Sequence, residues 1–246
     1  MKVRYKAVTA VTVITTLLTL TVMYFELSVV YGQNEESLPV ILIHGYRQDT
    51  SSWYIWEDLL QRDKIPYRLA NFTDGMCGSS EDHARELGQI VEQVKLDTES
   101  EKVNIVGFSK GGLDARVYLE DGNNNVENLI MIGTPNGGAP LAYWDFICQP
   151  AADDLEFGSE ATRAVRNLNT NYYTIYGDWV YPVWNGFFWI TTYGNPYIPA
   201  RDDGLVPVWS VNSKSYFTNI DNTFDHHNGL QTVNEYNIAR SILLGN

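Results

Sequence analysis

Basic residues are scarce in this sequence, and they form no stripe. The 246 residues include 17 Lys and Arg against 30 Asp and Glu, which gives a formal net charge of −13 at pH 7. Nucleic-acid phosphates are bound by clustered basic side chains, so we expect no nucleic-acid partner. An internal repeat is also absent, and 44% of the residues are apolar, which is enough for one large core in a single domain.

Motifs for metal ions and nucleotides are absent as well. Only four histidines occur, and the adjacent pair His226 and His227 lies in no H-E-x-x-H or carboxylate-rich pattern. The glycine-rich residues 133–138 lack the Lys-Ser/Thr pair of a phosphate loop, and no G-x-G-x-x-G precedes an expected helix. The sequence therefore implies no cofactor and no metal.

The first 32 residues are typical of a targeting segment that lies outside the fold. Three basic residues precede residues 7–25, which are apolar apart from threonines and long enough to span a bilayer. Two interpretations stay open: a signal peptide cleaved before Gln33, or an uncleaved N-terminal anchor, with which the lack of an A-x-A site agrees. Both place residues 33–246 outside the cytoplasm, either secreted or tethered to a membrane through residues 7–25.

Cysteine is nearly absent, with Cys77 and Cys148 alone. An exported chain passes through an oxidising compartment, where two cysteines can pair. Two separate buried thiols are the alternative, and we predict the disulfide. It would link the loop after the second expected strand to the segment that follows residue 139.

Short apolar runs alternate with amphipathic stretches along residues 33–246. This alternation predicts a mostly parallel sheet with helices on both faces, an α/β architecture. Sites in such sheets lie at the carboxyl ends of the strands. The expected strands are residues 39–43, 66–70, 103–106, 128–132, 172–176 and 215–220, and the expected helices are residues 52–62, 79–96 and 110–119, with a last helix after His227.

Residues 107–111 read G-F-S-K-G and lie between an expected strand and an expected helix. In that context G-x-S-x-G predicts a turn so tight that only glycine fits two residues before and after the serine. Ser109 would then lie at a helix N-terminus, where backbone N–H groups stabilise a developing negative charge. The alternative is a glycine-rich turn with an incidental serine.

Three segments resemble the lipase and carboxylesterase branch of the α/β-hydrolase superfamily. They are P-V-I-L-I-H-G-Y at residues 39–46, G-F-S-K-G-G-L-D-A-R at residues 107–116 and M-I-G-T-P-N-G-G-A at residues 131–139. The resemblance implies the α/β-hydrolase fold and ester hydrolysis by serine, aspartate and histidine in that chain order. It also implies an oxyanion hole built from the backbone N–H groups of Tyr46 and Lys110.

The acid and base implied by the resemblance lie near the C-terminus. Asp203 matches the aspartate of the family's D-G-x-V-P turn, with Asp202 and Asp178 as the alternatives. His227 matches the family's H-x-x-L step into the last helix, and His226 is the alternative. The predicted catalytic set is thus Ser109, Asp203 and His227.

The two remaining histidines are expected outside the catalytic set. His44 belongs to the expected oxyanion loop, and His83 lies beside charged residues on a helix, where we expect it to be solvated. We also expect the charged Lys110 side chain to lie near the entrance of the acyl pocket.

Aromatic residues accumulate in residues 139–201, where the periodicity weakens. We interpret this segment as a cap or lid that forms an apolar groove, and a satellite core is the alternative. The sequence therefore predicts an extracellular or membrane-anchored serine carboxylesterase or lipase acting on a small-molecule ester or lipid. A polyester depolymerase, an amidase and a noncatalytic binding module of the same fold are the alternatives.

Overall fold

The computed structural model describes residues 37–144, 147–184, 186–195, 197–198, 200–230 and 232–245. The predicted signal peptide or anchor, residues 1–32, lies outside these ranges, as does its membrane-spanning stretch at residues 7–25. Among the helices of the described residues, none combines the length and apolarity needed to cross a bilayer.

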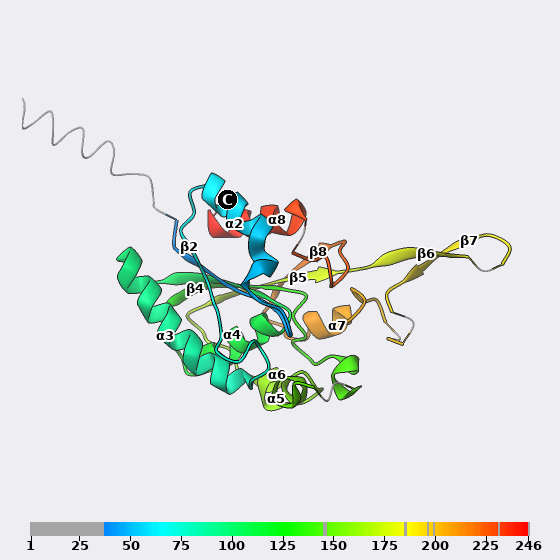
Figure 1. Cartoon of the computed structure of the whole chain (residues 1–246), viewed down its shortest axis with the longest axis horizontal. Coiled ribbons are helices and arrows are strands. Elements are labelled where there is room, and N and C mark those ends of the chain that lie inside the picture. The colour runs from blue at the N-terminus through cyan, green and yellow to red at the C-terminus, as the bar shows by residue number, and fades with distance from the viewer. Residues whose placement is uncertain are drawn as a thin grey trace, which may run out of the picture. The chain divides into compact units, whose positions relative to one another are not determined.

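A parallel six-stranded sheet forms the centre of residues 37–246, in the order β2-β1-β3-β4-β5-β8 (Figure 1). Its central strands are buried and mostly apolar because helices cover both faces of the sheet. All five neighbouring pairs are parallel, so the carboxyl ends of the strands meet at one edge. The strands are β1 (Val40–Ile43), β2 (Tyr67–Leu69), β3 (Val103–Phe108), β4 (Val126–Ile132), β5 (Asn171–Gly177) and β8 (Thr218–Asn222).

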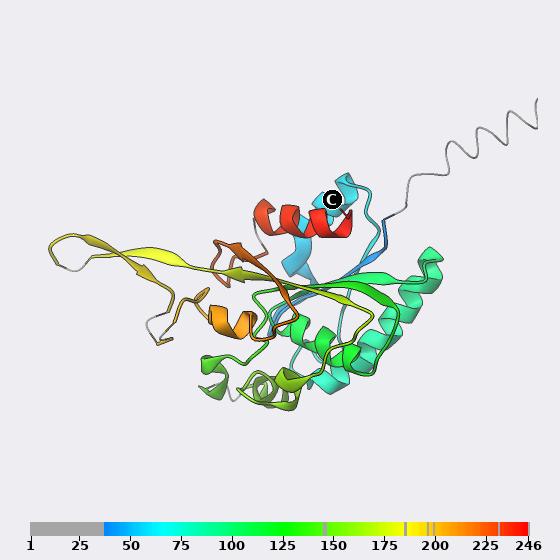
Figure 2. The ribbon, with the colours of Figure 1, turned by 180° about the vertical axis from the view of Figure 1, so that it is seen from behind.

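Two helices pack on each face of the sheet, as Figures 1 and 2 show from opposite sides. On one face, α3 (Ser80–Thr98) and α4 (Lys110–Glu120) bury Leu87, Val91 and Leu119 against the strands. On the other, α2 (Tyr54–Arg62) and α8 (Val233–Leu243) bury Trp56, Leu60 and Tyr236. The predicted alternation of strands and helices is confirmed.

The connection from β4 to β5 forms a small layer beside α4. It contains the 3₁₀ helix η2 (Pro140–Trp144) and the helices α5 (Gln149–Asp154) and α6 (Glu160–Arg163). Cys148, at the N-cap of α5, forms a disulfide with Cys77 in the loop after β2. The predicted disulfide is confirmed, and it attaches this layer to the loop before α3.

A two-stranded hairpin follows β5 and is separate from the central sheet. Its strands are β6 (Val180–Trp184) and β7 (Trp189–Tyr193), which pair with each other in antiparallel register. In Figures 1 and 2 the hairpin projects away from the sheet. The short helix α7 (Val208–Val211) then leads to β8.

Candidate active site

Ser109 lies on a tight turn between β3 and α4. Its φ of 51° and ψ of −123° place it in a left-handed region that residues other than glycine rarely adopt. A Cβ on Gly107 would lie 2.5 Å from the backbone of Gly112, and one on Gly111 would lie 2.5 Å from the carbonyl oxygen of His44. Only glycine fits at either position, so the G-x-S-x-G pattern forms the predicted strand-turn-helix junction.

Ser109, His226 and Asp203 form a chain of hydrogen bonds. His226 Nε2 lies 2.9 Å from Ser109 Oγ, and His226 Nδ1 lies 2.7 Å from Asp203 Oδ2. All three residues are buried, with exposed fractions of 7% for Ser109, 6% for His226 and 1% for Asp203. In this geometry the imidazole can take a proton from the serine hydroxyl, while the carboxylate orients the ring.

The loop that follows residue 201 fixes the Asp203 carboxylate. Asp203 Oδ1 accepts hydrogen bonds from the backbone N–H groups of Leu205 at 3.1 Å and Val206 at 2.8 Å. The backbone N–H of His226 in turn donates to the carbonyl oxygen of Asp203 at 2.7 Å. One carboxylate oxygen is therefore held by the backbone, and the other faces the imidazole.

The prediction that His227 contacts Ser109 and Asp203 is wrong. His226, the alternative, lies between them. Phe224 and His226 are both buried, whereas Asp225 is half-buried and His227 is exposed. Asp225 Oδ1 then accepts from the backbone N–H groups of His227 at 3.1 Å and Asn228 at 3.2 Å. The chain turns at these residues, and the exposed His227 side chain lines the pocket wall instead.

The two alternative acids lie elsewhere. Asp202 Oδ1 accepts from the backbone N–H groups of Asn195 at 2.8 Å and Gly204 at 2.6 Å, and burial raises the pKa of its carboxyl group. Asp178 accepts from Arg201 Nε at 3.0 Å. The structure therefore brings Asp203, as predicted, and neither alternative, against the histidine.

The loop after β1 approaches Ser109 closely. A Cβ on Gly45 would lie 3.1 Å from Ser109 Cβ, and the Gly45 N–H donates to Gln48 Oε1 at 3.0 Å. Tyr46 follows directly and lines the same pocket as Ser109. Lys110 is the first residue of α4, whose N-terminal backbone N–H groups lie at the positive end of the helix dipole. Both predicted oxyanion donors thus belong to segments that adjoin Ser109.

The Lys110 side chain points away from the pocket into a buried ionic cluster, which corrects the expectation that it lies near the entrance. Lys110 Nζ donates to Asp114 Oδ1 at 2.7 Å and lies 3.0 Å from His83 Nδ1. His83 Nδ1 is 2.8 Å from Asp114 Oδ2, and His83 Nε2 is 2.9 Å from Asp74 Oδ1. We refer to Lys110, Asp114, His83 and Asp74 as the elbow cluster.

The expectation that His83 is solvated is also wrong, since His83, Lys110 and Asp114 each have an exposed fraction of 0%. Burial lowers the pKa of His83, but hydrogen bonding and attraction to Asp114 outweigh it, so the pKa is raised. Burial raises the pKa of Asp114, yet attraction to Lys110 and the bond to His83 bring it below its usual range. The cluster combines two carboxylates with two cationic groups.

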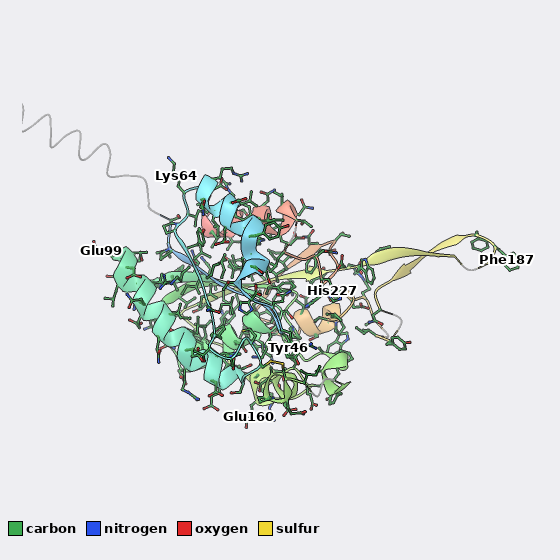
Figure 3. The ribbon with its side chains drawn as sticks, viewed as in Figure 1. Tyr46, Lys64, Glu99, Glu160, Phe187 and His227 are labelled. Atoms are coloured by element: carbon green, nitrogen blue, oxygen red, sulfur yellow. A yellow bond between two sulfur atoms is a disulfide. The ribbon has the colours of Figure 1, made fainter. Side chains whose placement is uncertain are left out.

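A pocket of about 440 Å³ opens beside Ser109. Its wall is mostly apolar and includes residues from α5 and from the loop after Asp203. Figure 3 labels Tyr46 and His227, which both line it. Across the described ranges, no three His, Cys, Asp or Glu residues are grouped so that they could hold a metal ion. The lining residues include Tyr46, Phe108, Ser109, Pro135, Ala139, Ala142, Ala152, Leu155, Leu205, Val206, His226 and His227.

Comparison with known proteins agrees with this architecture. Residues 39–187, more than half of the chain, match the family model described as palmitoyl protein thioesterase. The chain is 32% identical over 120 residues to triacylglycerol lipases of Pseudarthrobacter phenanthrenivorans and Burkholderia plantarii, a match that covers 44% of this chain. It spans only about a third of those relatives, namely 36% and 32% of their lengths.

Solved structures extend the similarity to most of the described fold. The mature form of the Bacillus licheniformis lipase BlEst2 superposes with a TM-score of 0.72 at 21% sequence identity. The superposition covers 85% of this chain and 93% of the lipase. The predicted α/β-hydrolase fold, with the mostly parallel sheet of lipases and esterases, is confirmed. The family match ends before Asp203 and His226, so their roles depend on the geometry described above.

Proposed function

Because the chain belongs to the palmitoyl protein thioesterase family, we propose that it is a serine hydrolase that cleaves carboxylic esters. The observation that carries this proposal is the hydrogen-bonded chain from Ser109 through His226 to Asp203 beside an apolar pocket. A noncatalytic binding module would not require these three hydrogen-bonded residues. All three are buried, and burying the ionisable His226 and Asp203 costs stability without a benefit unless they act in catalysis.

The proposed reaction starts with attack of Ser109 Oγ on the acyl carbon. The Asp203 carboxylate accepts a hydrogen bond from His226 Nδ1–H, which leaves Nε2 able to accept the serine proton. The same proton then passes from Nε2 to the leaving alcohol, and an acyl-enzyme forms. Water activated by His226 attacks the acyl carbon in the second half-reaction and releases the acid.

The negative oxygen of each tetrahedral intermediate is stabilised, in this proposal, by the backbone N–H groups of Tyr46 and Lys110. One such donor contributes about 3 kcal/mol to the transition state in serine hydrolases. The donors belong to the backbone, so the elbow cluster can use the Lys110 side chain for another purpose. Replacing that side chain leaves the donor in place.

The acyl group would occupy the pocket between α5 and the loop after Asp203. Small side chains such as Ala139, Ala142 and Ala152 leave room for an unbranched chain, and Leu155 and Val206 add apolar surface. Each buried methylene contributes about 0.8 kcal/mol, so kcat/KM should rise along a series of short acyl esters and fall once the pocket is full. A panel of p-nitrophenyl esters from acetate to palmitate measures the profile.

A thioester substrate is the second candidate, favoured by the description of the matching family. Thioesters and oxygen esters share the acyl-enzyme route, and they differ in the leaving group. Paired substrates with the same acyl chain, one p-nitrophenyl ester and one alkyl thioester, separate the two. A higher kcat/KM for the thioester across several chain lengths would favour this candidate.

The nucleophile is the first prediction to test. Ser109→Ala should abolish labelling by a fluorophosphonate probe and lower kcat/KM on a p-nitrophenyl ester by about 10⁴-fold or more. Ser80→Ala, at another buried serine at the start of α3, is the matched control for folding. Labelling that persists in Ser109→Ala would overturn the proposal.

We also propose that residues 33–246 act outside the cytoplasm, secreted or tethered through residues 7–25. The disulfide between Cys77 and Cys148 supports this placement, because such bonds persist in oxidising compartments. Fractionation of producing cells, followed by N-terminal sequencing of the mature chain, distinguishes the secreted form from the tethered one.

A further inference from the structure

The hairpin of β6 and β7 has a composition unlike the rest of the chain. Residues 179–200 contain no charged residue and no histidine, although the whole chain carries a net charge of −13. Eight of these residues are aromatic, with Phe187 and Phe188 in the turn between the strands. An aromatic and uncharged segment of this kind costs solubility unless something contacts it.

The tip of the hairpin is exposed. Phe187 has an exposed fraction of 87% and Phe188 of 60%. Figure 3 shows Phe187 at the far end of the arm, well away from His227 beside the pocket. Gly186 at the same turn has a φ of 99°, a backbone conformation that glycine adopts readily. Large apolar side chains are thus presented at the point most distant from the core.

The two strands have only each other as sheet partners among the residues that the structure describes. A two-stranded hairpin is only marginally stable by itself in water, so a surface that contacts the arm would stabilise it. We propose that this hairpin binds the surface of a zwitterionic phospholipid bilayer, with Phe187 and Phe188 inserted at the level of the headgroups.

Charge selects this surface over an anionic one. The arm supplies no basic residue, and the net charge of −13 is repelled by anionic lipids. Tyrosine, tryptophan and phenylalanine favour the membrane interface, because their rings are apolar while Tyr O–H and Trp N–H stay hydrated. The outer backbone edges of β6 and β7 would be unsatisfied in hydrocarbon, so only the tip enters and the strands stay at the interface.

The base of the hairpin connects this surface to the proposed active site. The backbone N–H of Trp179 donates to the carbonyl oxygen of Asp202 at 2.9 Å, and the N–H of Gly194 donates to the carbonyl oxygen of Trp179 at 2.7 Å. Asp202 also accepts from Asn195 at 2.8 Å. Asp203 follows directly, so the base of the hairpin adjoins the proposed triad. A bound hairpin would then attach the enzyme to a surface that contains lipid esters, a consequence that rests on the proposed function.

The test uses the full chain carrying Ser109→Ala, so that binding is measured without turnover and independently of the proposed hydrolysis. An environment-sensitive fluorophore is attached to Phe188→Cys, and in a control to Leu96→Cys on α3, where the native leucine is 74% exposed. With phosphatidylcholine vesicles, we expect a blue shift and a severalfold rise in emission at position 188 and no change at position 96. Equal responses at both positions would overturn the proposal.

A second pair of variants measures affinity. Phe187→Ser/Phe188→Ser should weaken vesicle binding by about tenfold or more, because binding follows the apolar area buried at the interface. Leu96→Ser, which removes exposed apolar area elsewhere, should leave binding unchanged. Because residues 7–25 can insert into a bilayer by themselves, both variants are compared as residues 33–246, the form expected after signal cleavage, so that the difference between them reports the hairpin. Unchanged binding in the double variant, binding that requires anionic lipid, or a dimer in sedimentation velocity that the double variant abolishes would each contradict the proposal.

Discussion

Two buried histidines contact neighbouring residues of the turn, His226 at Ser109 and His83 at Lys110, and each also contacts a carboxylate. His226 Nδ1 is 2.7 Å from Asp203, and His83 Nδ1 is 2.8 Å from Asp114. The second ring nitrogens differ: His226 Nε2 faces Ser109 Oγ at 2.9 Å, whereas His83 Nε2 faces a second carboxylate, Asp74, at 2.9 Å.

This difference distinguishes His226, which can transfer a proton, from His83, whose role is structural. Carboxylates on both ring nitrogens of His83 outweigh the opposing charge of Lys110 Nζ, 3.0 Å from Nδ1, and favour the doubly protonated ring, which has no lone pair to accept a proton. A single carboxylate at His226 leaves Nε2 available beside a hydroxyl group and a pocket. A buried pair of histidine and aspartate therefore does not by itself indicate catalysis. The partner of the second ring nitrogen decides whether the histidine can accept a proton.

The largest effect should come from the histidine pair at residues 226 and 227. His226→Ala removes the proposed base, so we expect kcat/KM on p-nitrophenyl butyrate to fall by about 10⁴-fold or more. His227→Ala trims the pocket wall and should change kcat/KM by less than about tenfold. Steady-state kinetics of both variants decide the assignment. A deeper loss in His227→Ala would reverse it.

The neighbouring aspartates give a second matched pair. Asp203→Asn alters the partner of His226 Nδ1 and should lower kcat by about 10⁴-fold, because the amide favours the wrong imidazole tautomer. Asp202→Asn keeps an oxygen for the backbone N–H groups of Asn195 and Gly204, so kcat should stay within about tenfold. Equal losses in the two variants would show that the loop geometry, and not the carboxylate on His226, limits the rate.

The sequence predicted the fold and the nucleophile well because both depend on local patterns. Continuous apolar runs such as Val40–Ile43 indicate strands covered on both faces, and all six expected strands of the central sheet are present. Gly107 is required by the close approach of the Gly112 backbone, and Gly111 by that of the His44 carbonyl oxygen on the neighbouring segment. Both glycines nevertheless belong to the five-residue G-x-S-x-G pattern, so the pattern can be recognised from the residues themselves.

The base and the elbow cluster depend on side-chain directions set by distant parts of the chain. His226 and His227 are adjacent, so a shift of one residue decides which of them faces Ser109. The turn in which Asp225 accepts from the His227 N–H determines that choice. Lys110 and Asp114 are four residues apart on one helix, a spacing typical of an ion pair, but only the packing of α3 against α4 shows that the pair is buried with His83. Sequence spacing alone gave no sign of this burial.

The elbow cluster should contribute to stability more than to chemistry. Lys110→Met leaves Asp114 and His83 buried with a changed charge balance, so we expect the free energy of unfolding to fall by about 3–5 kcal/mol. The control Lys102→Met breaks the half-exposed pair with Glu127 and should cost less than about 1 kcal/mol. Urea unfolding measures both. An equal cost in the two variants would show that burial of the cluster is energetically unimportant.

The smallest effect concerns pH. Burial lowers the pKa of His83, but its carboxylate partners outweigh this and raise it, so protonated His83 stabilises the folded state. That contribution is complete below the unfolded-state pKa of 6.5 and is lost as pH rises through the raised folded-state pKa. His83→Gln should therefore cost more stability at about pH 6 than at about pH 9, by on the order of 1 kcal/mol, in urea unfolding at both values. His227→Gln, at the exposed neighbour of His226, is the control. A cost that is the same at both pH values would show that His83 is neutral in the folded protein and that the elbow cluster carries an unbalanced carboxylate charge.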